Sequence, residues 1–95
     1  MRAKLRFRER IALSDTEFAE LVVWLVDPPV RGSSHPYKYR LAFVSDNRCV
    51  LRFDNEAGKG DHMHIDDEER SYTFVDEVSL RADFWKEVRR WKMKH

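Results

Sequence analysis

The sequence predicts an α+β fold, in which an antiparallel four- to five-stranded meander sheet carries one C-terminal helix on its apolar face. Three observations support this prediction. Apolar and polar residues alternate with a period of two over most of the first half of the chain, which indicates strands. Short turn signals separate these segments, which favours hairpin connections. From about Asp76 the apolar residues recur at helical spacing, and the length of 95 residues predicts a single domain over residues 1–95.

The first two expected strands span residues 2–13 and 17–26. The first alternates between apolar and polar residues, so we expect one buried and one solvated face. The second follows the turn signal Ser14-Asp15 and ends in a run that is apolar at both parities, which favours a central position in the sheet. Prolines, a glycine and two serines then predict a loop over residues 27–36.

The next two expected strands span residues 37–44 and 48–53. The short connection at residues 45–47 favours an antiparallel hairpin between them. A turn-rich loop is expected over residues 53–66, and a short strand at residues 71–74 would be the fifth of the sheet.

The segment that begins near Asp76 has the pattern of an amphipathic helix. Either Asp76 or Ser79 can cap its start, and its basic end suits the negative pole of the helix dipole. The apolar residues expected on its buried side are Leu80, Phe84, Val88 and Trp91, with Val78 and Trp85 beside them.

The composition indicates the cellular location of the protein but not its partners. Lys and Arg number 18 against 17 Asp and Glu, so the net charge of +1 says nothing about partners. The single cysteine, Cys49, excludes an intramolecular disulfide, and its parity with Leu51 and Phe53 predicts a core position where a thiol is inert. No apolar run approaches the length of a membrane span, and the N-terminus lacks the apolar centre of a signal peptide. We therefore expect a cytoplasmic protein without membrane attachment.

The strand pattern predicts a basic face that the neutral total conceals. The cations on the solvated parity of the expected strands are Arg2, Lys4, Arg6, Arg8, Arg10, Lys38, Arg40, Arg48 and Arg52. If the helix covers the opposite face, this surface would attract nucleic acid. The alternative is an ordinary solvated face that Glu9, Glu17 or Glu20 neutralises in part. Tyr37 and Tyr39 fall on the apolar parity, which favours a core position over base stacking.

The stretch FDNEAGKGDHMHID, residues 53–66, is the strongest candidate for a functional site. A Walker A loop is excluded, because Lys59 is followed by Gly60 and Phe53 stands where that motif requires glycine. Gly58 and Gly60 still allow a close approach of the backbone to an anion, although an ordinary glycine turn explains them equally well.

Metal binding is the second chemistry that the residues of this stretch allow. His62 and His64 lie two residues apart, so both imidazoles fall on one side of an extended segment. With Asp54, Asp61 or Asp66 they have the donor types for a divalent ion. No cysteine pair assists and no fourth ligand is evident, so neither a metal nor another cofactor is expected.

Metal-free cleavage of RNA is the third chemistry. It needs a base for the 2′-hydroxyl proton, an acid for the leaving oxygen and a cation for the charge on phosphorus. Histidine, with an unperturbed pKa of about 6.5, suits both proton roles, and lysine or arginine suits the third. The candidate catalytic residues are His62, His64, Lys59, Asp54, Asp61 and Arg40. The candidate substrate-binding residues are His35, Tyr37, Lys38, Asn55, Gly58, Gly60, Arg6 and Arg8.

Two motifs of this chain resemble those of the TumE-type toxins of prokaryotic toxin–antitoxin pairs. The more specific is D-N-x-x-G-K-G-D-H-x-H at residues 54–64, and the second is H-P-Y-K-Y-R at residues 35–40. The likeness extends from the opening strands to Phe84-Trp85-Lys86-Glu87-Val88, and so covers most of the chain. It implies a cytoplasmic toxin that is held in check by a helix-turn-helix antitoxin encoded beside it.

Three functions fit these residues, and they differ in what they require. The leading hypothesis is a toxin that acts as a metal-independent endoribonuclease, since many comparable toxins are ribonucleases. A non-catalytic module that binds nucleic acid or protein through the basic face is the alternative, and a nucleotide-dependent RNA-modifying toxin is the third. The oligomeric state stays open: an exposed Trp24 or Trp91 would favour a homodimer, whereas buried tryptophans would not.

Overall fold

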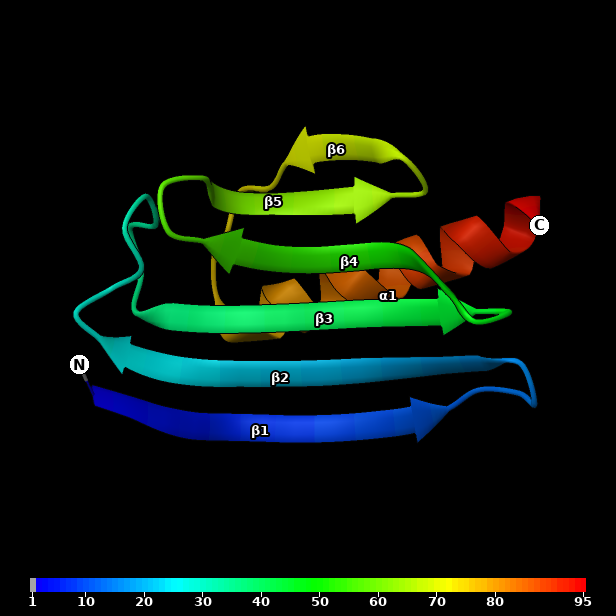
Figure 1. Cartoon of the computed structure of the whole chain (residues 1–95), viewed down its shortest axis with the longest axis horizontal. Helices are drawn as coiled ribbons and strands as arrows, with labels where there is room; N and C mark the ends of the chain where they lie inside the picture. Colours follow the sequence, from blue (N-terminus) through cyan, green and yellow to red (C-terminus); the bar gives the residue numbers. More distant parts are fainter. Residues whose placement is uncertain (1) are drawn as a thin grey trace.

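The computed structural model, which describes residues 2–95, has an α+β fold with an antiparallel meander sheet and one C-terminal helix, as predicted (Figure 1). The sheet has six strands, however, where four to five were expected, and they follow one another in the order β1-β2-β3-β4-β5-β6. The elements are β1 (Arg2–Ala12), β2 (Glu17–Asp27), β3 (Tyr37–Ser45), β4 (Arg48–Glu56), β5 (Gly60–Ile65), β6 (Glu68–Ser71) and α1 (Glu77–Lys94).

The additional strand lies inside the stretch that was expected to be a loop. β4 continues to Glu56 and β5 begins at Gly60, so this stretch is a hairpin around a tight turn. Its polar and apolar residues alternate from His62 to Ile65, which is a strand pattern, but the glycines and aspartates in front of it suggest a loop. The last strand lies at Glu68–Ser71 instead of residues 71–74.

The helix covers one face of the sheet and forms the core with it (Figure 1). Asp76 caps the helix, because its carboxylate accepts a hydrogen bond from the backbone N–H of Ser79 at 2.6 Å. Val78 is 78% exposed, so its expected place on the buried side is wrong. The core consists of Ala19, Leu21, Val23, Tyr39, Leu41, Phe43, Val50, Leu51, Phe53, Leu80, Phe84 and Val88. We call this side of the sheet the helix face and the other side the open face.

A bulge in β1 changes which cations lie on the open face. The register with β2 shifts at Arg6, so that Arg8 lies opposite an open-face residue of β2 while Lys4 lies opposite a residue of helix-face parity. A bulge inserts one residue into a strand and thereby exchanges its two faces. Arg8 and Arg10 therefore belong to the open face and Arg2 and Lys4 do not, and the expectation that all five cations of β1 share one face is wrong.

A second irregularity explains why the cysteine is not in the core. The register of β3 and β4 shifts between Phe43 and Val44, and Cys49 lies opposite Val44. Cys49 is exposed, while the neighbouring Val50 is buried in its place. The predicted core position of the thiol is therefore wrong.

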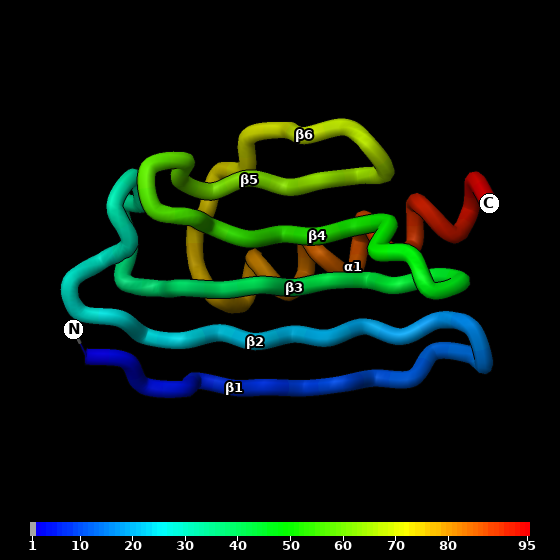
Figure 2. The backbone as a smooth tube through the Cα atoms, in the orientation of Figure 1, coloured from blue at the N-terminus to red at the C-terminus, as the bar shows by residue number. Residues whose placement is uncertain are grey.

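The long connection between β2 and β3, residues 28–36, folds back against the β4–β5 turn at one end of the sheet (Figure 2). The backbone N–H of Gly58 donates to the carbonyl of Arg31 at 2.8 Å. A Cβ atom at Gly60 would lie 2.9 Å from the carbonyl oxygen of Gly32, so the backbones meet where only glycine fits. The connection is thus fixed to the hairpin that contains the sequence motif.

Candidate functional site

The hairpin motif is divided between the two faces of the sheet by the alternation of its strands. Asp54 lies opposite His62 across β4 and β5, and Arg40 lies opposite Asp54 across β3 and β4. In the neighbouring row Arg52 lies opposite His64. Directly opposed side chains in an antiparallel sheet lie close together on the same face. These five side chains therefore gather on the open face, which the helix leaves uncovered.

Three of them form a compact cluster of donors, which we call the Asp-His-His cluster: Asp54, His62 and His64. The Nε2 atom of His62 lies 2.7 Å from Oδ1 of Asp54, and the two imidazole rings lie 5.0 Å apart at 80°. One donor atom from each residue falls within 4.8 Å of the others. Asp54 is only 6% exposed and His62 only 4%. The cluster is thus tight and largely shielded from bulk water.

The donor atoms of the cluster are close together but form no hydrogen bonds among the described residues. Oδ1 of Asp54 and the Nε2 atoms of His62 and His64 are buried without a hydrogen-bond partner, although Oδ1 and Nε2 of His62 lie at the distance of an ion pair. Arg52 Nε is also buried without a hydrogen-bond partner, and it lies 3.1 Å from Oδ2 of Asp54. Buried polar atoms are nearly always paired in proteins. A group of unpaired atoms at one point therefore indicates a functional site.

A hollow of about 360 Å³ adjoins the cluster on the open face. Its cationic side chains are Lys38, Arg40 and Arg52, and Trp24 supplies an aromatic surface. Its complete lining is Val22, Trp24, Lys38, Tyr39, Arg40, Arg52, Asp54 and Glu56. A concave site with three cations and an aromatic ring has the composition to hold a phosphorylated ligand. Asp54 is the member of the Asp-His-His cluster that lines it, while His62 and His64 lie in the adjoining strand β5.

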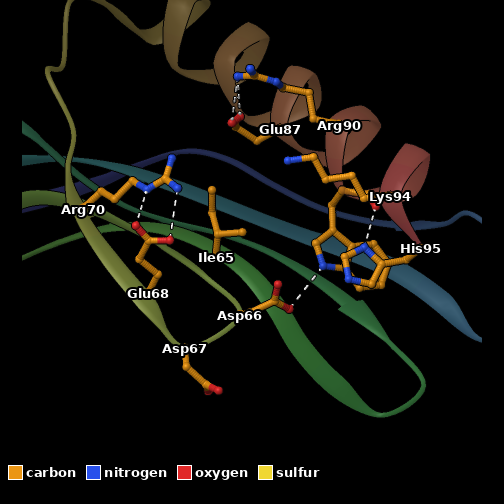
Figure 3. A pocket seen from close by; sticks show the side chains of 10 residues that line it. Ile65, Asp66, Asp67, Glu68, Arg70, Glu87, Arg90, Lys94 and His95 are labelled. Carbon is orange, nitrogen blue, oxygen red and sulfur yellow. Dashed lines mark hydrogen bonds and ion pairs between the residues drawn. The ribbon is translucent and has the colours of Figure 1, made fainter.

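A hollow of about 410 Å³ lies elsewhere, between the β5–β6 connection and the end of α1 (Figure 3). Its side chains are already paired: Arg70 with Glu68, Arg90 with Glu87 and Trp91 with Asp66. Asp66, considered from the sequence as a metal ligand, accepts the indole N–H of Trp91 at 3.2 Å and lies here rather than in the cluster. This hollow therefore offers less for catalysis than the open face.

The helix-face members of the motifs form a separate hydrogen-bonded network. The backbone N–H of Tyr37 donates to Nδ1 of His35 at 3.1 Å, so the ring proton is on Nε2, which donates to Asp61 at 2.8 Å. The Tyr39 hydroxyl donates to the same carboxylate oxygen at 2.7 Å. Burial, followed by this hydrogen bond, holds the pKa of Tyr39 well above its usual range. Phe74 stacks on the His35 ring at 3.8 Å.

Asn55 is the central member of this helix-face network. It is fully buried, and its Oδ1 accepts from the backbone N–H of Tyr39 at 3.1 Å. Its Nδ2 donates to the carbonyl of Tyr37 at 2.7 Å and to the Ser33 hydroxyl at 3.2 Å. All hydrogen-bonding groups of the amide are thus engaged in joining the β2–β3 connection to the sheet.

The structure therefore separates the residues that the sequence grouped together. It brings His62, His64, Asp54, Arg40 and Lys38 to one place on the open face, and Arg8 lies in the row of Arg40 and Asp54. It does not bring the other candidates there: His35, Tyr37, Asn55 and Asp61 belong to the helix-face network, and Gly58, Lys59 and Gly60 form the β4–β5 turn.

Arg6 does not belong to the open-face site, because its side chain pairs with a residue of the helix. Its guanidinium pairs with Glu77 at the start of α1, at 3.2 Å. This ion pair holds the pKa of Arg6 above its ordinary value. The bulge in β1 directs Arg6 toward the helix, and the sequence gives no signal for this.

Two residues of the open-face site were not assigned to the histidine cluster from the sequence: Arg52 was predicted only as a cation of the basic face, and Trp24 only as a residue that would favour a homodimer if exposed. Arg52 has the parity of Asp54 two positions earlier, and this relation becomes visible once the stretch after Phe53 is treated as strand. Trp24 lies opposite Lys38 and lines the hollow. Its place is evident only from the register of β2 and β3.

A comparison with known protein families gives a match over nearly the whole chain. Residues 2–92 are similar to the family described as Toxin TumE. No match was found among curated proteins or among solved structures. Within the described part of the chain, no helix is both long and apolar enough to span a membrane.

Proposed function

The chain belongs to the TumE toxin family, and from this premise we propose that it acts on RNA as an endoribonuclease that needs no metal. Membership makes the protein a toxin of a toxin–antitoxin system, whose partner is an antitoxin. The observation that carries the proposal is the Asp-His-His cluster beside the cationic hollow on the open face. Two imidazoles lie on the same face of the sheet as arginine and lysine side chains of the kind that can bind phosphate.

The reaction would be a transfer of the phosphodiester to the neighbouring 2′-hydroxyl. One imidazole of the pair His62 and His64 takes the 2′-hydroxyl proton, and the 2′-oxygen attacks phosphorus. The bond from phosphorus to the 5′-oxygen breaks, and the other imidazole gives that oxygen a proton. The products are a 2′,3′-cyclic phosphate and a 5′-hydroxyl end. Asp54, 2.7 Å from the Nε2 atom of His62, would stabilise the positive charge that this ring gains when it takes the proton.

The cations of the hollow supply the third requirement, stabilisation of the charge on phosphorus. Arg40 and Arg52 are the cross-strand neighbours of Asp54 and His64. A guanidinium can donate two parallel hydrogen bonds to a phosphate. Lys38, with the Trp24 ring opposite, would hold a flanking nucleotide through charge and stacking.

We further propose that the partner is a helix-turn-helix antitoxin and that the toxin acts in the cytoplasm. Both statements extend the family membership and do not depend on the chemistry of the cluster. An antitoxin that neutralises the proposed reaction would cover the hollow on the open face. Co-purification of the complex, followed by RNA binding with and without the antitoxin, tests this placement.

The decisive experiment is incubation of the purified protein with end-labelled RNA, with and without EDTA. We expect cleavage in both conditions and products with cyclic phosphate or 3′-phosphate ends. The variant His62→Gln/His64→Gln should lose at least a hundredfold in rate, because general acid–base catalysis contributes about 10²–10⁴-fold. The matched control is His95→Gln, which changes a histidine at the end of α1, outside the cluster, and should cleave like the wild type.

Two results would contradict this proposal. Cleavage by a folded His62→Gln/His64→Gln variant at the wild-type rate would remove the histidines from the chemistry. An absolute need for added nucleotide, with a group attached to the RNA instead of a cut, would show a modifying toxin. Circular dichroism of each variant separates loss of catalysis from loss of fold.

The arrangement of cations also favours a second function, a non-catalytic module that holds RNA on the open face. Arg8, Arg40 and Arg52 lie on that face independently of the histidines. For such a module, Arg8→Glu should abolish growth arrest while His62→Gln/His64→Gln leaves it unchanged. If the protein is a ribonuclease, His62→Gln/His64→Gln should reduce growth arrest more than Arg8→Glu does.

A further inference from the structure

We propose that the Asp-His-His cluster is a binding site for one divalent transition-metal ion, with Zn²⁺ as the best-suited ion. The ligand atoms would be Oδ1 of Asp54, Nε2 of His62 and Nε2 of His64. Only the effect of the ion on catalysis, discussed below, rests on the proposed ribonuclease function. The site itself rests on the geometry of the three side chains.

The first argument is the convergence of unpaired donor atoms. One ligand atom from each of the three residues lies within 4.8 Å of the others. Oδ1 of Asp54 and the Nε2 atoms of both histidines are buried without a hydrogen-bond partner among residues 2–95. Asp54 and His62 are both more than nine-tenths buried. Two imidazoles with one carboxylate form a set that binds zinc and related ions, whereas Mg²⁺ and Ca²⁺ prefer oxygen ligands.

The second argument is the state of the His62 ring. Its Nδ1 lies 3.2 Å from the carbonyl oxygen of Gly60, which can only accept, so Nδ1 carries a proton. In the neutral ring the lone pair is then on Nε2, which faces the Asp54 carboxylate at 2.7 Å. Two lone pairs at this distance repel each other unless a positive charge lies between them. A second ring proton or a metal ion meets this requirement. The absence of a hydrogen bond between the two atoms favours the metal ion.

The surroundings of the ligands have the arrangement that supports metal sites. Metal-bound histidines commonly donate their other ring N–H to a backbone carbonyl, as His62 does to Gly60. The second carboxylate oxygen of Asp54 lies 3.1 Å from Arg52 Nε, which leaves Oδ1 for the ion. The nearby guanidiniums of Arg52 and Arg40 oppose a cation by charge, so we expect affinity in the micromolar range rather than nanomolar.

Occupancy by a metal and acid–base catalysis exclude each other in this cluster. A nitrogen lone pair that coordinates an ion cannot accept a proton. In the ribonuclease proposed above, Zn²⁺ would therefore inhibit cleavage, and removal of the ion by a chelator would restore it. This gives the metal the role of an inhibitor of the toxin.

The binding test is isothermal titration of the metal-stripped protein with Zn²⁺, and with Mg²⁺ as the comparison ion. We expect one Zn²⁺ per chain and at least tenfold weaker binding of Mg²⁺. His64→Gln and Asp54→Asn should each weaken Zn²⁺ binding at least tenfold, while the control His95→Gln should bind like the wild type. A shift of the ¹⁵N resonances of the His62 and His64 rings on addition of Zn²⁺ would identify the coordinating nitrogens.

The outcomes separate the metal site from the ribonuclease. The site would be overturned if the folded wild type did not bind Zn²⁺. It would also be overturned if His64→Gln and Asp54→Asn bound Zn²⁺ with the same affinity as the wild type. Specific Zn²⁺ binding without any RNA cleavage would support the site and overturn the ribonuclease. Cleavage that requires Zn²⁺ would also support the site, but would overturn both the metal-independent mechanism and the inhibitory role.

Discussion

The two faces of the β4–β5 hairpin carry polar residues of the same types in opposite states. On the helix face, both amide atoms of Asn55 form hydrogen bonds, and Oδ1 of Asp61 accepts from His35 and Tyr39. On the open face, Asp54, His62 and His64 are close to one another but have buried atoms without partners among the described residues. One short motif therefore contains a paired half and an unpaired half, divided by the alternation of a strand.

This difference indicates which half has a role beyond folding. A buried polar atom without a partner costs about 1–3 kcal/mol. The helix-face half avoids this cost and holds the β2–β3 connection in place. On the open face, Nε2 of His64 has no partner among the described residues. The contacts of Asp54 with His62 and Arg52, at 2.7 and 3.1 Å, are ion pairs without the geometry of hydrogen bonds, so part of this cost remains. Such a cost is explained if a substrate, a proton or an ion completes the site.

The largest expected effect concerns the paired half. Asn55→Ala removes three hydrogen bonds and leaves backbone groups of Tyr37 and Tyr39 without partners. We expect a loss of about 3–5 kcal/mol in the free energy of unfolding, measured by urea denaturation. A loss below about 1 kcal/mol would show that the network does not hold the connection.

The neighbouring Asp54→Asn is the matched control on the open face. It exchanges nearly isosteric groups and removes the charge of the ion pairs with His62 and Arg52, while Oδ1 of the carboxylate has no hydrogen bond to lose. We expect a change in the free energy of unfolding below about 1 kcal/mol together with a large loss of toxicity. If Asp54→Asn unfolds the protein as Asn55→Ala does, the division into two halves is wrong.

The next effect concerns the glycines of the turn. Gly60 has φ of +74°, and an added Cβ would lie 2.9 Å from the backbone oxygen of Gly32. Gly58 has φ of +86°, but its Cβ would meet only the mobile end of the Arg31 side chain at 3.2 Å. We expect Gly60→Ala to cost about 3 kcal/mol and Gly58→Ala about 1 kcal/mol in thermal or urea unfolding. If the two substitutions lowered the free energy of unfolding equally, the β2–β3 connection would not be tightly packed against the β4–β5 hairpin at Gly60.

A smaller effect follows from the raised pKa of Tyr39, which burial and the bond to Asp61 cause. The unfolded chain releases the phenol proton near pH 10, its usual pKa, while the folded chain retains it. The stabilisation is therefore complete below about pH 10 and is lost as the pH rises further. Tyr39→Phe should cost about 1–2 kcal/mol at neutral pH and reduce the decline of stability above pH 10. If the free energy of unfolding fell equally steeply with pH in the wild type and in Tyr39→Phe, the decline above pH 10 would not come from Tyr39.

Most of the fold was evident in the sequence, because it depends on periodicity. The alternation in β1 to β4 and the helical spacing of Leu80, Phe84 and Val88 reflect the burial of one face of each element. β5 was not recognised, because its glycines and aspartates have the composition of a loop. The strand pattern of His62 to Ile65 was present but was outweighed by that composition.

Less of the candidate site was evident, because a site depends on register. The sequence grouped Asp54, Asp61, His62 and His64 by proximity along the chain. Strand alternation places Asp61 on the other face, where it pairs with His35 and Tyr39. A bulge is harder to foresee, since its extra residue leaves the composition of the strand unchanged. For this reason the face of the β1 cations could be established only from the structure.

The smallest expected effect tests that bulge directly. Arg8→Gln removes a cation from the open face, in the row that continues to Arg40 and Asp54. Arg2→Gln removes the same charge on the N-terminal side of the bulge. Arg2 lies opposite Asp27, which has the parity of the helix face. If RNA occupies the open face, Arg8→Gln should weaken binding severalfold and lower the salt slope of log K by about 0.7, the contribution of one phosphate contact on a single strand.

Arg2→Gln is expected to bind RNA with the wild-type affinity and salt slope. Fluorescence anisotropy of labelled RNA at several salt concentrations measures both quantities for the two variants. Because both substitutions remove one charge from the same strand, a general effect of net charge would lower both slopes equally. Equal slopes would therefore contradict RNA binding on the open face, whereas a difference would locate the RNA on the side of the sheet that holds the unpaired histidines.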